Sequence, residues 1–236
     1  MENREGVLGV LGGMGPQATN TFYQRIIART QAESDQEHLR VLIWGDAKIP
    51  DRTVGILSGR EEPVYQHLLA DAKLLEQAGC THIAITCNTA HYFADRIQAE
   101  LVVPIIHMPR ETVKAILASG KKTVGILATD GTIRTGIYQK ELERAGLTAV
   151  TPKGEIQRIV MSIIYDEIKR GKPGSPEKFE KIDAFLQEAG CDCAILGCTE
   201  LSVYRVDNGL PPYYIDAMEV LAEQAILRCG KELRRE

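Results

Sequence analysis

Two short cysteine-containing runs hold the residues of this sequence that could do acid–base chemistry. Cys87 stands in Ile-Thr-Cys-Asn-Thr at 85–89, and Cys198 stands in Leu-Gly-Cys-Thr-Glu at 196–200. Each run follows an Ala-Gly-Cys triplet, and the equivalent residues are 111 positions apart (198 − 87 = 111). This gapless match predicts a duplicated half, with one thiol from each half on opposite walls of a shared cleft. Inversion of a stereocentre requires two such opposed proton carriers.

Both cysteines stand where a buried strand is predicted to give way to a helix, which is the edge of a parallel sheet at which ligands bind. A thiol at a helix start faces unpaired backbone N–H groups and the positive end of the helix dipole, and both lower its pKa. Asn88, Thr89 and Thr199 follow the cysteines and suit either capping of those N–H groups or binding of a ligand carboxylate. A lone cysteine in such a place is more often a small buried hydrophobic residue. The repeated pair with polar neighbours favours catalysis.

Three further segments hold candidate ligand-binding residues. Gly-Gly-Met-Gly-Pro at 12–16 lacks the Lys-Ser/Thr ending of a P-loop and does not fit G-x-G-x-x-G. It is therefore compatible with a small carboxylate ligand or with a tight turn that binds nothing. Arg52, in a predicted loop after a strand, can hold a carboxylate through two parallel hydrogen bonds, although a loop arginine is usually just solvated. Lys169 is ordinary for the last turn of a helix.

The other cysteines and two histidines are predicted to be structural. Cys191 and Cys193 have a poor spacing for zinc, and Cys80 occupies the position that matches Cys191 in the first half. We interpret these three as packing thiols and expect no metal site. His91 and His107 lie near the active edge of the first half, and we expect each of them to pack or to cap a helix.

Short apolar runs alternate with amphipathic stretches, a pattern typical of βαβ units with a parallel sheet. In the first half we predict strands at 6–11, 39–45, 82–86 and 102–107, with helices from about 18 and over 62–78. The second half repeats this order, with strands at 123–128, 193–197 and 212–216, and helices from about 136, over 155–170, over 177–189 and finally over 218–233.

The fold class that these elements predict is α/β, with two similar Rossmann-like lobes whose parallel sheets are related by a pseudo-two-fold duplication. The active site is expected in the cleft between the lobes. We place the first lobe at 1–112 and the second at 113–216. The last segment, 217–236, is expected to join the first lobe, although the sequence alone leaves that open.

The composition limits the possible partners and location. A chain of 236 residues can bury a substantial core. A net charge of −4 and a pI near 5.8 give no electrostatic case for nucleic acid or an anionic membrane. The first residues, Met1–Gly6, are polar, and no apolar run is long enough to span a bilayer. Six cysteines fit a reducing compartment, so we expect a cytoplasmic protein.

Four motifs together resemble one family. They are GGMGP at 12–16, IPDRT at 49–53, TCNTAH at 86–91 and GCTE at 197–200. The chain is similar to the cofactor-independent aspartate/glutamate racemases, and more narrowly to their aspartate racemase branch, from near residue 12 to the Tyr-Ile-Asp segment near 215. The resemblance implies an acid–base pair formed by Cys87 and Cys198. It also implies a substrate site whose residues are Met14, Pro50, Asp51, Arg52, Asn88, Thr89, Lys169, Thr199 and Glu200.

Within that site, the resemblance implies that Arg52 and Lys169 hold the side-chain carboxylate of the substrate. It implies interconversion of L- and D-aspartate without pyridoxal phosphate or another cofactor, and an acidic amino acid as the small-molecule partner. The family tends to form homodimers. Apolar helix faces such as 159–164 could serve a dimer, but internal packing explains them equally well.

Several alternatives stay open. Within the fold they are racemisation of glutamate, of a broader set of amino acids or of a hydantoin, and isomerisation of maleate by one nucleophilic cysteine. From another class comes a non-catalytic, two-lobed protein that binds an acidic metabolite. Retention of both thiols disfavours it, because binding alone needs neither. A nucleotide-dependent enzyme is disfavoured because the phosphate-binding residues are missing.

Overall fold

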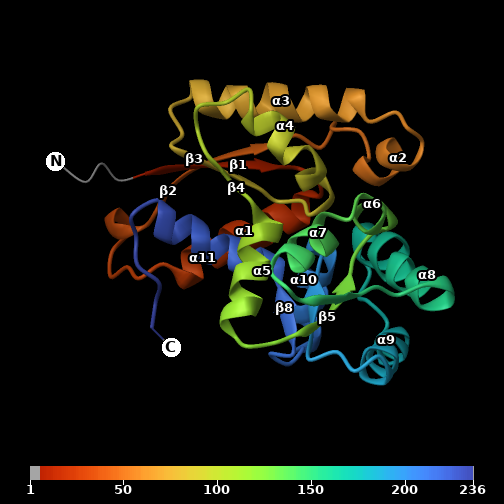
Figure 1. Cartoon of the computed structure of the whole chain (residues 1–236). Helices are drawn as coiled ribbons and strands as arrows, with labels where there is room; N and C mark the ends of the chain where they lie inside the picture. Colours follow the sequence, from red (N-terminus) through yellow and green to blue (C-terminus); the bar gives the residue numbers. More distant parts are fainter. Residues whose placement is uncertain (1–5, 236) are drawn as a thin grey trace.

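Two four-stranded parallel sheets form the framework of the chain. A computed structural model describes residues 6–235, so most of the Met1–Gly6 segment and the outermost ends of the predicted lobes lie outside the described residues. The strand orders are β2-β1-β3-β4 and β6-β5-β7-β8, and every neighbouring pair is parallel. The second sheet repeats the order of the first, so the predicted α/β fold with duplicated lobes is confirmed (Figure 1).

The first half contains the elements that lead up to Cys87 and the connection to the second half. In chain order they are β1 (Val7–Gly12), α1 (Pro16–Arg29), the 3-10 turn η1 (Asp35–Glu37), β2 (Arg40–Gly45), α2 (Arg52–Leu57), α3 (Glu62–Gln77), β3 (His82–Ile85), the 3-10 turn η2 (Thr89–Phe93), α4 (Ala94–Gln98), β4 (Ile105–Ile106) and α5 (Met108–Ala118).

The second half contains the elements that lead up to Cys198 and the final helix. In chain order they are β5 (Thr123–Leu127), α6 (Asp130–Thr135), α7 (Ile137–Arg144), β6 (Thr148–Val150), α8 (Gly154–Ser162), the π-helical turn η3 (Ile163–Glu167), the 3-10 turn η4 (Ile168–Arg170), α9 (Pro176–Glu188), β7 (Cys193–Leu196), α10 (Thr199–Asn208), β8 (Tyr214–Asp216) and α11 (Ala217–Arg228).

Several local elements differ in detail from the predictions. The first helix begins at Pro16 rather than near 18, because a proline at the first helical position loses no hydrogen bond. Arg52 begins the short helix α2 instead of lying in a loop. The strand β6 was not predicted, and the helix expected from about 136 is preceded by α6. The helix expected over 155–170 changes from α to π and then to 3-10 geometry.

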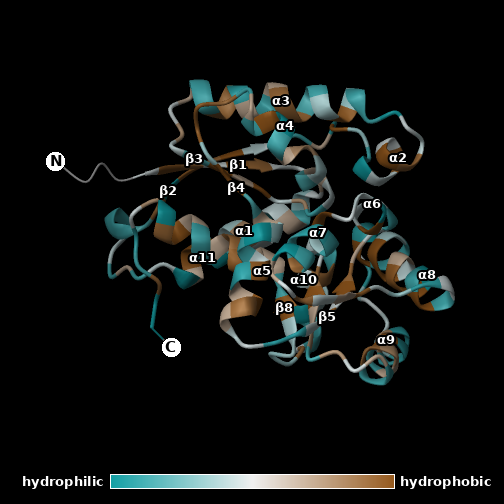
Figure 2. Cartoon of the chain, viewed as in Figure 1, coloured by the Kyte–Doolittle hydropathy of each residue, from teal (hydrophilic) through white to brown (hydrophobic). Residues whose placement is uncertain are grey.

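Helices cover both faces of each sheet. In Figure 1, α3 lies above the first sheet, while α1 and α11 lie beneath it. Figure 2 shows mostly hydrophobic strands, whereas helices such as α3 and α9 alternate hydrophobic and hydrophilic turns, as expected for a helix with one buried face. Strands that are covered on both faces read as continuous apolar runs, and β1 and β7 both do so.

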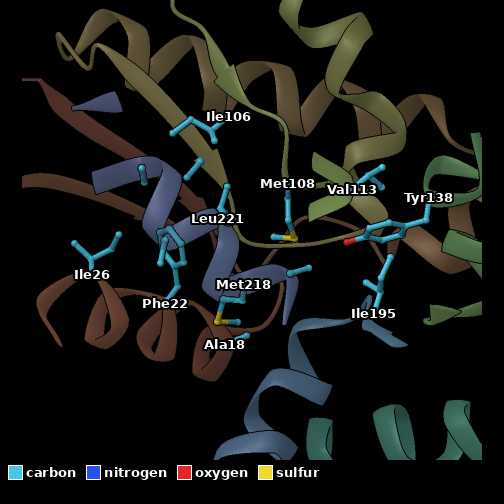
Figure 3. Packing of buried hydrophobic residues seen from close by; sticks show 14 of the residues in the cluster. Ala18, Phe22, Ile26, Ile106, Met108, Val113, Tyr138, Ile195, Met218 and Leu221 are labelled. Atoms are coloured by element: carbon cyan, nitrogen blue, oxygen red, sulfur yellow. The ribbon is translucent and has the colours of Figure 1, made fainter. Parts of the chain in front are cut away.

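The largest hydrophobic cluster lies between the two sheets and is shared by them. It joins Phe22 of α1 and Ile106 of β4 to Ile195 of β7, and Met218 and Leu221 of α11 fill its centre (Figure 3). α11 packs against both α1 and α5. The boundary expected between 112 and 113 falls inside α5, and the division of the chain into 1–112 with 217–236 and 113–216 stays a prediction.

We predict that Leu221→Ala lowers the free energy of unfolding by about 2–5 kcal/mol, because this fully buried side chain leaves a cavity in the shared core. Leu227→Ala on the same helix is the matched control, because that side chain is 46% exposed and should change stability by no more than about 0.5 kcal/mol. Urea unfolding of both variants measures the difference. Equal losses would show that α11 is not a core element.

Candidate active site

The two motif cysteines line one small chamber at the carboxyl ends of the central strands. Cys87 follows β3 and Cys198 follows β7, and each is less than a tenth exposed. The chamber has a volume of about 10 Å³, which leaves room for about one water molecule. Its other lining residues are Met14, Arg52, Thr53, Asn88, Thr89, Thr129, Tyr165, Lys169, Thr199 and Glu200.

Seven of the nine predicted substrate-site residues line the chamber, and two do not. Pro50 and Asp51 stand behind Arg52, where the Pro50 carbonyl accepts a hydrogen bond from the guanidinium and Asp51 caps α2. Three lining residues were missed. Thr129 follows the strand β5 and could have been found as the counterpart of the loop after β1. Thr53 is the last residue of the IPDRT motif and could have been included with it. Tyr165 carries no signal in the sequence pattern.

Cys198 occupies the N-cap position of α10, and its thiol donates a hydrogen bond of 2.8 Å to the Glu200 carboxylate. Burial, and then the negative charge of Glu200, raise the pKa of Cys198 well above its ordinary value, and Lys169 only partly offsets them. The prediction that a helix start lowers the thiol pKa was therefore wrong for Cys198. Desolvation in the closed chamber outweighs the helix dipole. In this arrangement Cys198 is a thiol that donates a hydrogen bond to Glu200.

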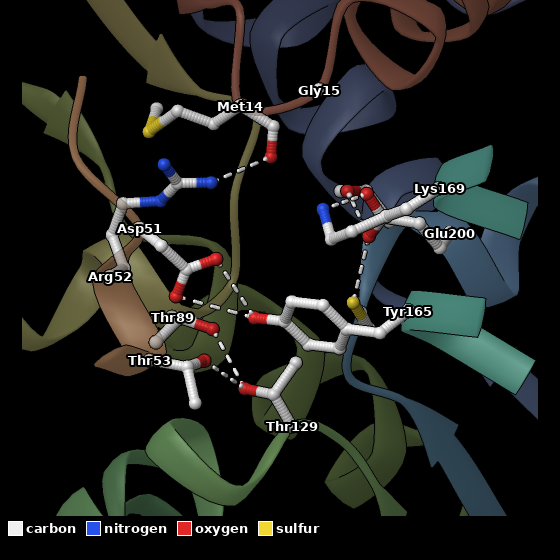
Figure 4. Close-up of polar contacts among 12 residues, drawn as sticks. Met14, Gly15, Asp51, Arg52, Thr53, Thr89, Thr129, Tyr165, Lys169 and Glu200 are labelled. Atoms are coloured by element: carbon white, nitrogen blue, oxygen red, sulfur yellow. Dashed lines mark hydrogen bonds and ion pairs between the residues drawn. The ribbon is translucent and has the colours of Figure 1, made fainter. Parts of the chain in front are cut away.

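Lys169 forms an ion pair with Glu200 on the same wall of the chamber (Figure 4). Burial opposes the charged ammonium, but Glu200 and then Cys198 outweigh it and raise the pKa of Lys169. Lys169 is therefore protonated and lies close to Cys198. Glu200 is buried, and the partly exposed ammonium of Lys169 satisfies its carboxylate.

Arg52 is held from three sides by backbone carbonyl groups. Its guanidinium donates to the carbonyls of Met14 (3.1 Å), Ile49 (3.2 Å) and Pro50 (3.1 Å), while its buried Nε has no protein acceptor. Burial opposes its charge, but Cys87 and then Asp51 favour it and raise the pKa of Arg52. The protein therefore places a fixed positive charge beside Cys87.

A sharp turn after β1 makes the Met14 carbonyl available to Arg52. Gly13 has a φ of +87°, and a Cβ at this position would lie 2.3 Å from the carbonyl carbon of Asp46. Only glycine fits both the left-handed backbone and this close approach. The glycine-rich run is thus a tight turn that orients a backbone carbonyl toward Arg52.

Threonine hydroxyls join the two lobes beside the chamber. Thr129 bonds Thr53 at 3.2 Å and Thr89 at 3.0 Å, and Thr89 also bonds Thr132 at 2.9 Å. Gly131 permits this approach, because a Cβ there would lie 2.9 Å from the Cα of Thr53. A hydroxyl both donates and accepts, so this network can reorient its protons around an anionic ligand.

Tyr165 lines the chamber and contacts Asp51 of the first lobe. The tyrosine hydroxyl from the π-helical turn η3 donates to Asp51 Oδ2 at 3.1 Å, which connects the second lobe to the first (Figure 4). Burial, and then the charges of Asp51 and Cys198, raise the pKa of Tyr165, so the hydroxyl keeps its proton. On its other side, Tyr165 lines an open groove of about 520 Å³ with Lys153 and Arg158. Tyr165 therefore separates the chamber from this groove.

The residues that follow the cysteines do not cap the helices. Neither η2 nor α10 has a side-chain cap. Asn88 Oδ1 instead accepts a hydrogen bond from Tyr138, and its buried Nδ2 has no protein acceptor, while the hydroxyl of Thr199 bonds Glu200. Buried donors without acceptors are costly, so Asn88 Nδ2 and Arg52 Nε suit a ligand that carries carboxylate oxygens.

His91 and His107 have the structural roles that the sequence predicted. The Cys87 carbonyl lies 2.8 Å from His91 Nδ1, and His91 Nε2 accepts from the Met108 N–H, so the ring is neutral with its proton on Nδ1. Burial lowers the pKa of His91 from 6.5 to about 4. His107 caps α5 through Nδ1. His91 therefore fixes the turn that carries Cys87.

The remaining cysteines are free and pack into hydrophobic clusters, as predicted for Cys80, Cys191 and Cys193. Burial raises the pKa of Cys193 to about 11. Among residues 6–235, no group of three His, Cys, Asp or Glu side chains is placed to hold a metal ion. Over the same range, none of the helices combines the length and the apolar character needed to cross a membrane.

Comparisons with known proteins agree with this geometry. A sequence model of the Asp/Glu/Hydantoin racemase family matches residues 11–225. The structure of an aspartate racemase from Picrophilus torridus is 31% identical, with a TM-score of 0.81 and 97% of this chain and 96% of that chain covered. An aspartate racemase homologue from Pyrococcus horikoshii is 27% identical, with a TM-score of 0.76 and coverages of 94% and 98%. A broad-specificity amino-acid racemase from Bacillus subtilis is 29% identical over 93% of this chain and 96% of its own.

The fold and site therefore define a two-lobed amino-acid racemase, an isomerase. This chain belongs to the Asp/Glu/hydantoin racemase family.

The neutral His91 makes stability depend on pH. Unfolding restores its ordinary pKa, so between pH 6.5 and about 4 the unfolded chain binds the proton first and the folded state loses stability as pH falls. The shift corresponds to at most about 3 kcal/mol. We predict that His91→Asn weakens this dependence in urea unfolding at pH 7 and pH 5, whereas His67→Asn, at an exposed position, leaves it unchanged. The same pH dependence in both variants would contradict this assignment.

Proposed function

We propose that this chain interconverts the L and D forms of aspartate through the thiols of Cys87 and Cys198, without a cofactor. The observation that carries the proposal is the shared chamber, in which thiols from equivalent strand ends of the two lobes meet beside groups of opposite character. Arg52 places positive charge near Cys87, and Glu200 accepts the proton of Cys198 in a hydrogen bond. We therefore assign Cys87, as a thiolate, to accept a proton and Cys198, as a thiol, to donate one.

In the first direction, Cys87 as a thiolate removes the α-proton of one enantiomer, and Arg52 balances its charge. Cys198 then delivers its proton to the opposite face of the α-carbon. In the reverse direction Cys198 must first lose its proton, and the Glu200 carboxylate at 2.8 Å is the group that can take it. Lys169 balances the negative charge of the Cys198 thiolate and Glu200. In the reverse direction Cys198 therefore accepts the α-proton, and Cys87 donates one.

The α-proton of an amino acid is very weakly acidic, so the site must also stabilise a carbanion. We assign the α-carboxylate to Asn88 Nδ2, the threonine hydroxyls and the backbone N–H groups at the start of α10, which are fixed donors in a water-poor chamber. The side-chain carboxylate is assigned to Arg52 and Lys169. Arg52 is buried and Lys169 is partly shielded beside Glu200, so both cations can attract an acidic substrate more strongly than they would in open water.

Substrate entry requires the chamber to open, since about 10 Å³ is far too small for an amino acid. The contact between Tyr165 and Asp51 joins the lobes across the entrance and must break first. Its re-formation behind the substrate would exclude water during the reaction. We expect the enzyme to work in the cytoplasm, where its six free cysteines stay reduced.

A second candidate function is racemisation of glutamate or of a broader set of amino acids. It is favoured by the relatives, because the Bacillus subtilis protein is a broad-specificity racemase and a glutamate racemase from Methylococcus capsulatus is 30% identical over 58% of this chain. Chiral analysis with a panel of L and D amino acids in deuterated water separates the candidates. Equal rates with aspartate and with neutral amino acids would reject aspartate specificity.

We predict that Cys87→Ala and Cys198→Ala each lower kcat/KM for racemisation by at least about 10³-fold, because each removes one of two proton carriers. Each variant should still exchange the α-proton of one enantiomer with deuterium, and the two variants should prefer opposite enantiomers. Cys191→Ala is the control and should stay active, because this half-buried thiol lies outside the chamber. Full racemisation by either active-site variant would exclude the two-thiol mechanism.

We predict that Arg52→Ala raises KM for aspartate by about 100-fold and changes KM for alanine little, because the guanidinium binds only the side-chain carboxylate. Arg52→Lys keeps the charge but loses the fork geometry, so its defect should be intermediate. Arg60→Ala, in the exposed connection before α3, is the matched control, and thermal melting reports whether each variant folds. Undiminished preference for aspartate over alanine in a folded Arg52→Ala protein would refute the role.

A further inference from the structure

Tyr138 is a fully buried tyrosine that does not line the chamber but contacts both cysteine runs. It lies on the buried face of α7, and its ring belongs to the core shared by the two sheets (Figure 3). Its hydroxyl donates a hydrogen bond to Oδ1 of Asn88, the residue that follows Cys87. Its ring lies against Gly197, the residue that precedes Cys198. One side chain of the second lobe therefore connects the two halves of the site from behind.

The ring of Tyr138 can approach the backbone before Cys198 because residue 197 is a glycine. A Cβ at Gly197 would lie 3.2 Å from Cε2 of the ring, which is closer than side chains normally pack. The equivalent residue of the first lobe is Thr86 (197 − 111 = 86), whose own hydroxyl bonds Thr19 at 3.2 Å. Gly197 has no hydroxyl, and the aromatic ring makes the contact instead. A ring packed in this way leaves its phenol oxygen little freedom to move.

The phenol oxygen of Tyr138 in turn determines how the Asn88 amide is oriented. Asn88 stands at the N-cap position of η2, where an asparagine ordinarily accepts from a backbone N–H, but it makes no such cap. Its Oδ1 instead accepts from Tyr138. Burial raises the pKa of Tyr138, and the contact with Thr112 only partly offsets this, so the hydroxyl keeps the proton that it donates.

An anchored amide oxygen also fixes the amide nitrogen, because both belong to one planar group. Asn88 is 2% exposed and lines the chamber, and its buried Nδ2 has no protein acceptor. The hydrogen bond from Tyr138 therefore leaves Asn88 with one free donor of fixed direction. A buried donor of this kind is costly unless a ligand satisfies it.

We propose that Tyr138 is a positioning residue for racemisation, which orients the Asn88 amide so that Nδ2 meets the α-carboxylate of the substrate. The inference rests on the proposed function, in which Nδ2 is one of the donors to that carboxylate. Negative charge moves onto the α-carboxylate as the α-proton leaves, so a donor that is already oriented stabilises the transition state more than the bound substrate. Without the hydroxyl, Oδ1 is free to turn toward the backbone N–H groups of η2, and Nδ2 loses its fixed direction.

Tyr138→Phe tests the proposal, because it removes only the hydroxyl and keeps the ring beside Gly197. We expect kcat for racemisation of aspartate to fall by about 10- to 100-fold, while KM changes by less than about threefold, since the bound substrate keeps its other donors. Tyr214→Phe is the matched control, because this tyrosine of the second lobe is 2% exposed and its hydroxyl bonds Asp183 outside the chamber. The control should keep its kcat, and thermal melting reports whether both variants fold.

A double-mutant cycle with Asn88→Ala shows whether Tyr138 acts through Asn88. Asn88→Ala should lower kcat at least as much as Tyr138→Phe does. Adding Tyr138→Phe to Asn88→Ala should then change kcat by less than about twofold, because no amide is left to orient. A merely structural role would lower kcat by the same factor in both backgrounds. Such multiplying losses, or an unchanged kcat in Tyr138→Phe, or an equal loss in Tyr214→Phe, would overturn the proposal.

The unchanged chain separates failure of this inference from failure of the proposed function. If the unchanged chain does not racemise aspartate, the proposed function is wrong, and the role of Tyr138 is rejected with it. If the unchanged chain racemises aspartate and Tyr138→Phe does so equally fast, only the role of Tyr138 is wrong.

Discussion

The hydrophobic core between the two sheets is the constraint on which the rest of the structure depends. Because α11 returns to pack with α1 and α5, residues from both sheets meet in one cluster, with Met218 and Leu221 at its centre. That shared core fixes the distance between β3 and β7, the two strands that lead to the cysteines. Two independent lobes on a flexible linker would leave the distance between the thiols undefined. A reaction that needs proton carriers on both sides of one carbon requires this rigidity.

Charge balance in the closed chamber follows from the same geometry. The two cations of the chamber, Arg52 and Lys169, each have a carboxylate near them, Asp51 for Arg52 and Glu200 for Lys169. The balance is uneven in detail. Lys169 is paired directly with Glu200, whereas Arg52 is bonded to neutral carbonyl groups and keeps its buried Nε without an acceptor. An incoming carboxylate therefore finds its best partner at Arg52. Lys169 can bind the substrate carboxylate only while it also pairs with Glu200. Because Glu200 accepts the hydrogen bond from Cys198, substrate binding at Lys169 is coupled to the group that takes the proton of Cys198.

Much of the fold and of the site could be predicted, because the patterns that indicate them are visible in the sequence itself. The 111-residue offset revealed the duplication, and apolar runs located most strands. Asp51 before Arg52 is a helix N-cap signal, so α2 was predictable in principle, although a loop was expected. Tyr165 was not predictable, because its place in the chamber depends on a π-helical turn and on the opposite lobe. The pKa of Cys198 was mispredicted because the helix start is visible in sequence, while the burial that outweighs it is tertiary.

The closure of the chamber depends on polar contacts between segments that are far apart in the chain. The Tyr165–Asp51 contact and the threonine network lie where α2 of the first lobe meets η3 and α6 of the second. The apolar core shared by the two sheets lies elsewhere and holds β3 and β7 in place. Opening of the entrance therefore has to break the polar contacts at α2, η3 and α6, while the strands that carry the two cysteines keep their spacing. The same few contacts exclude water when they form again behind the substrate.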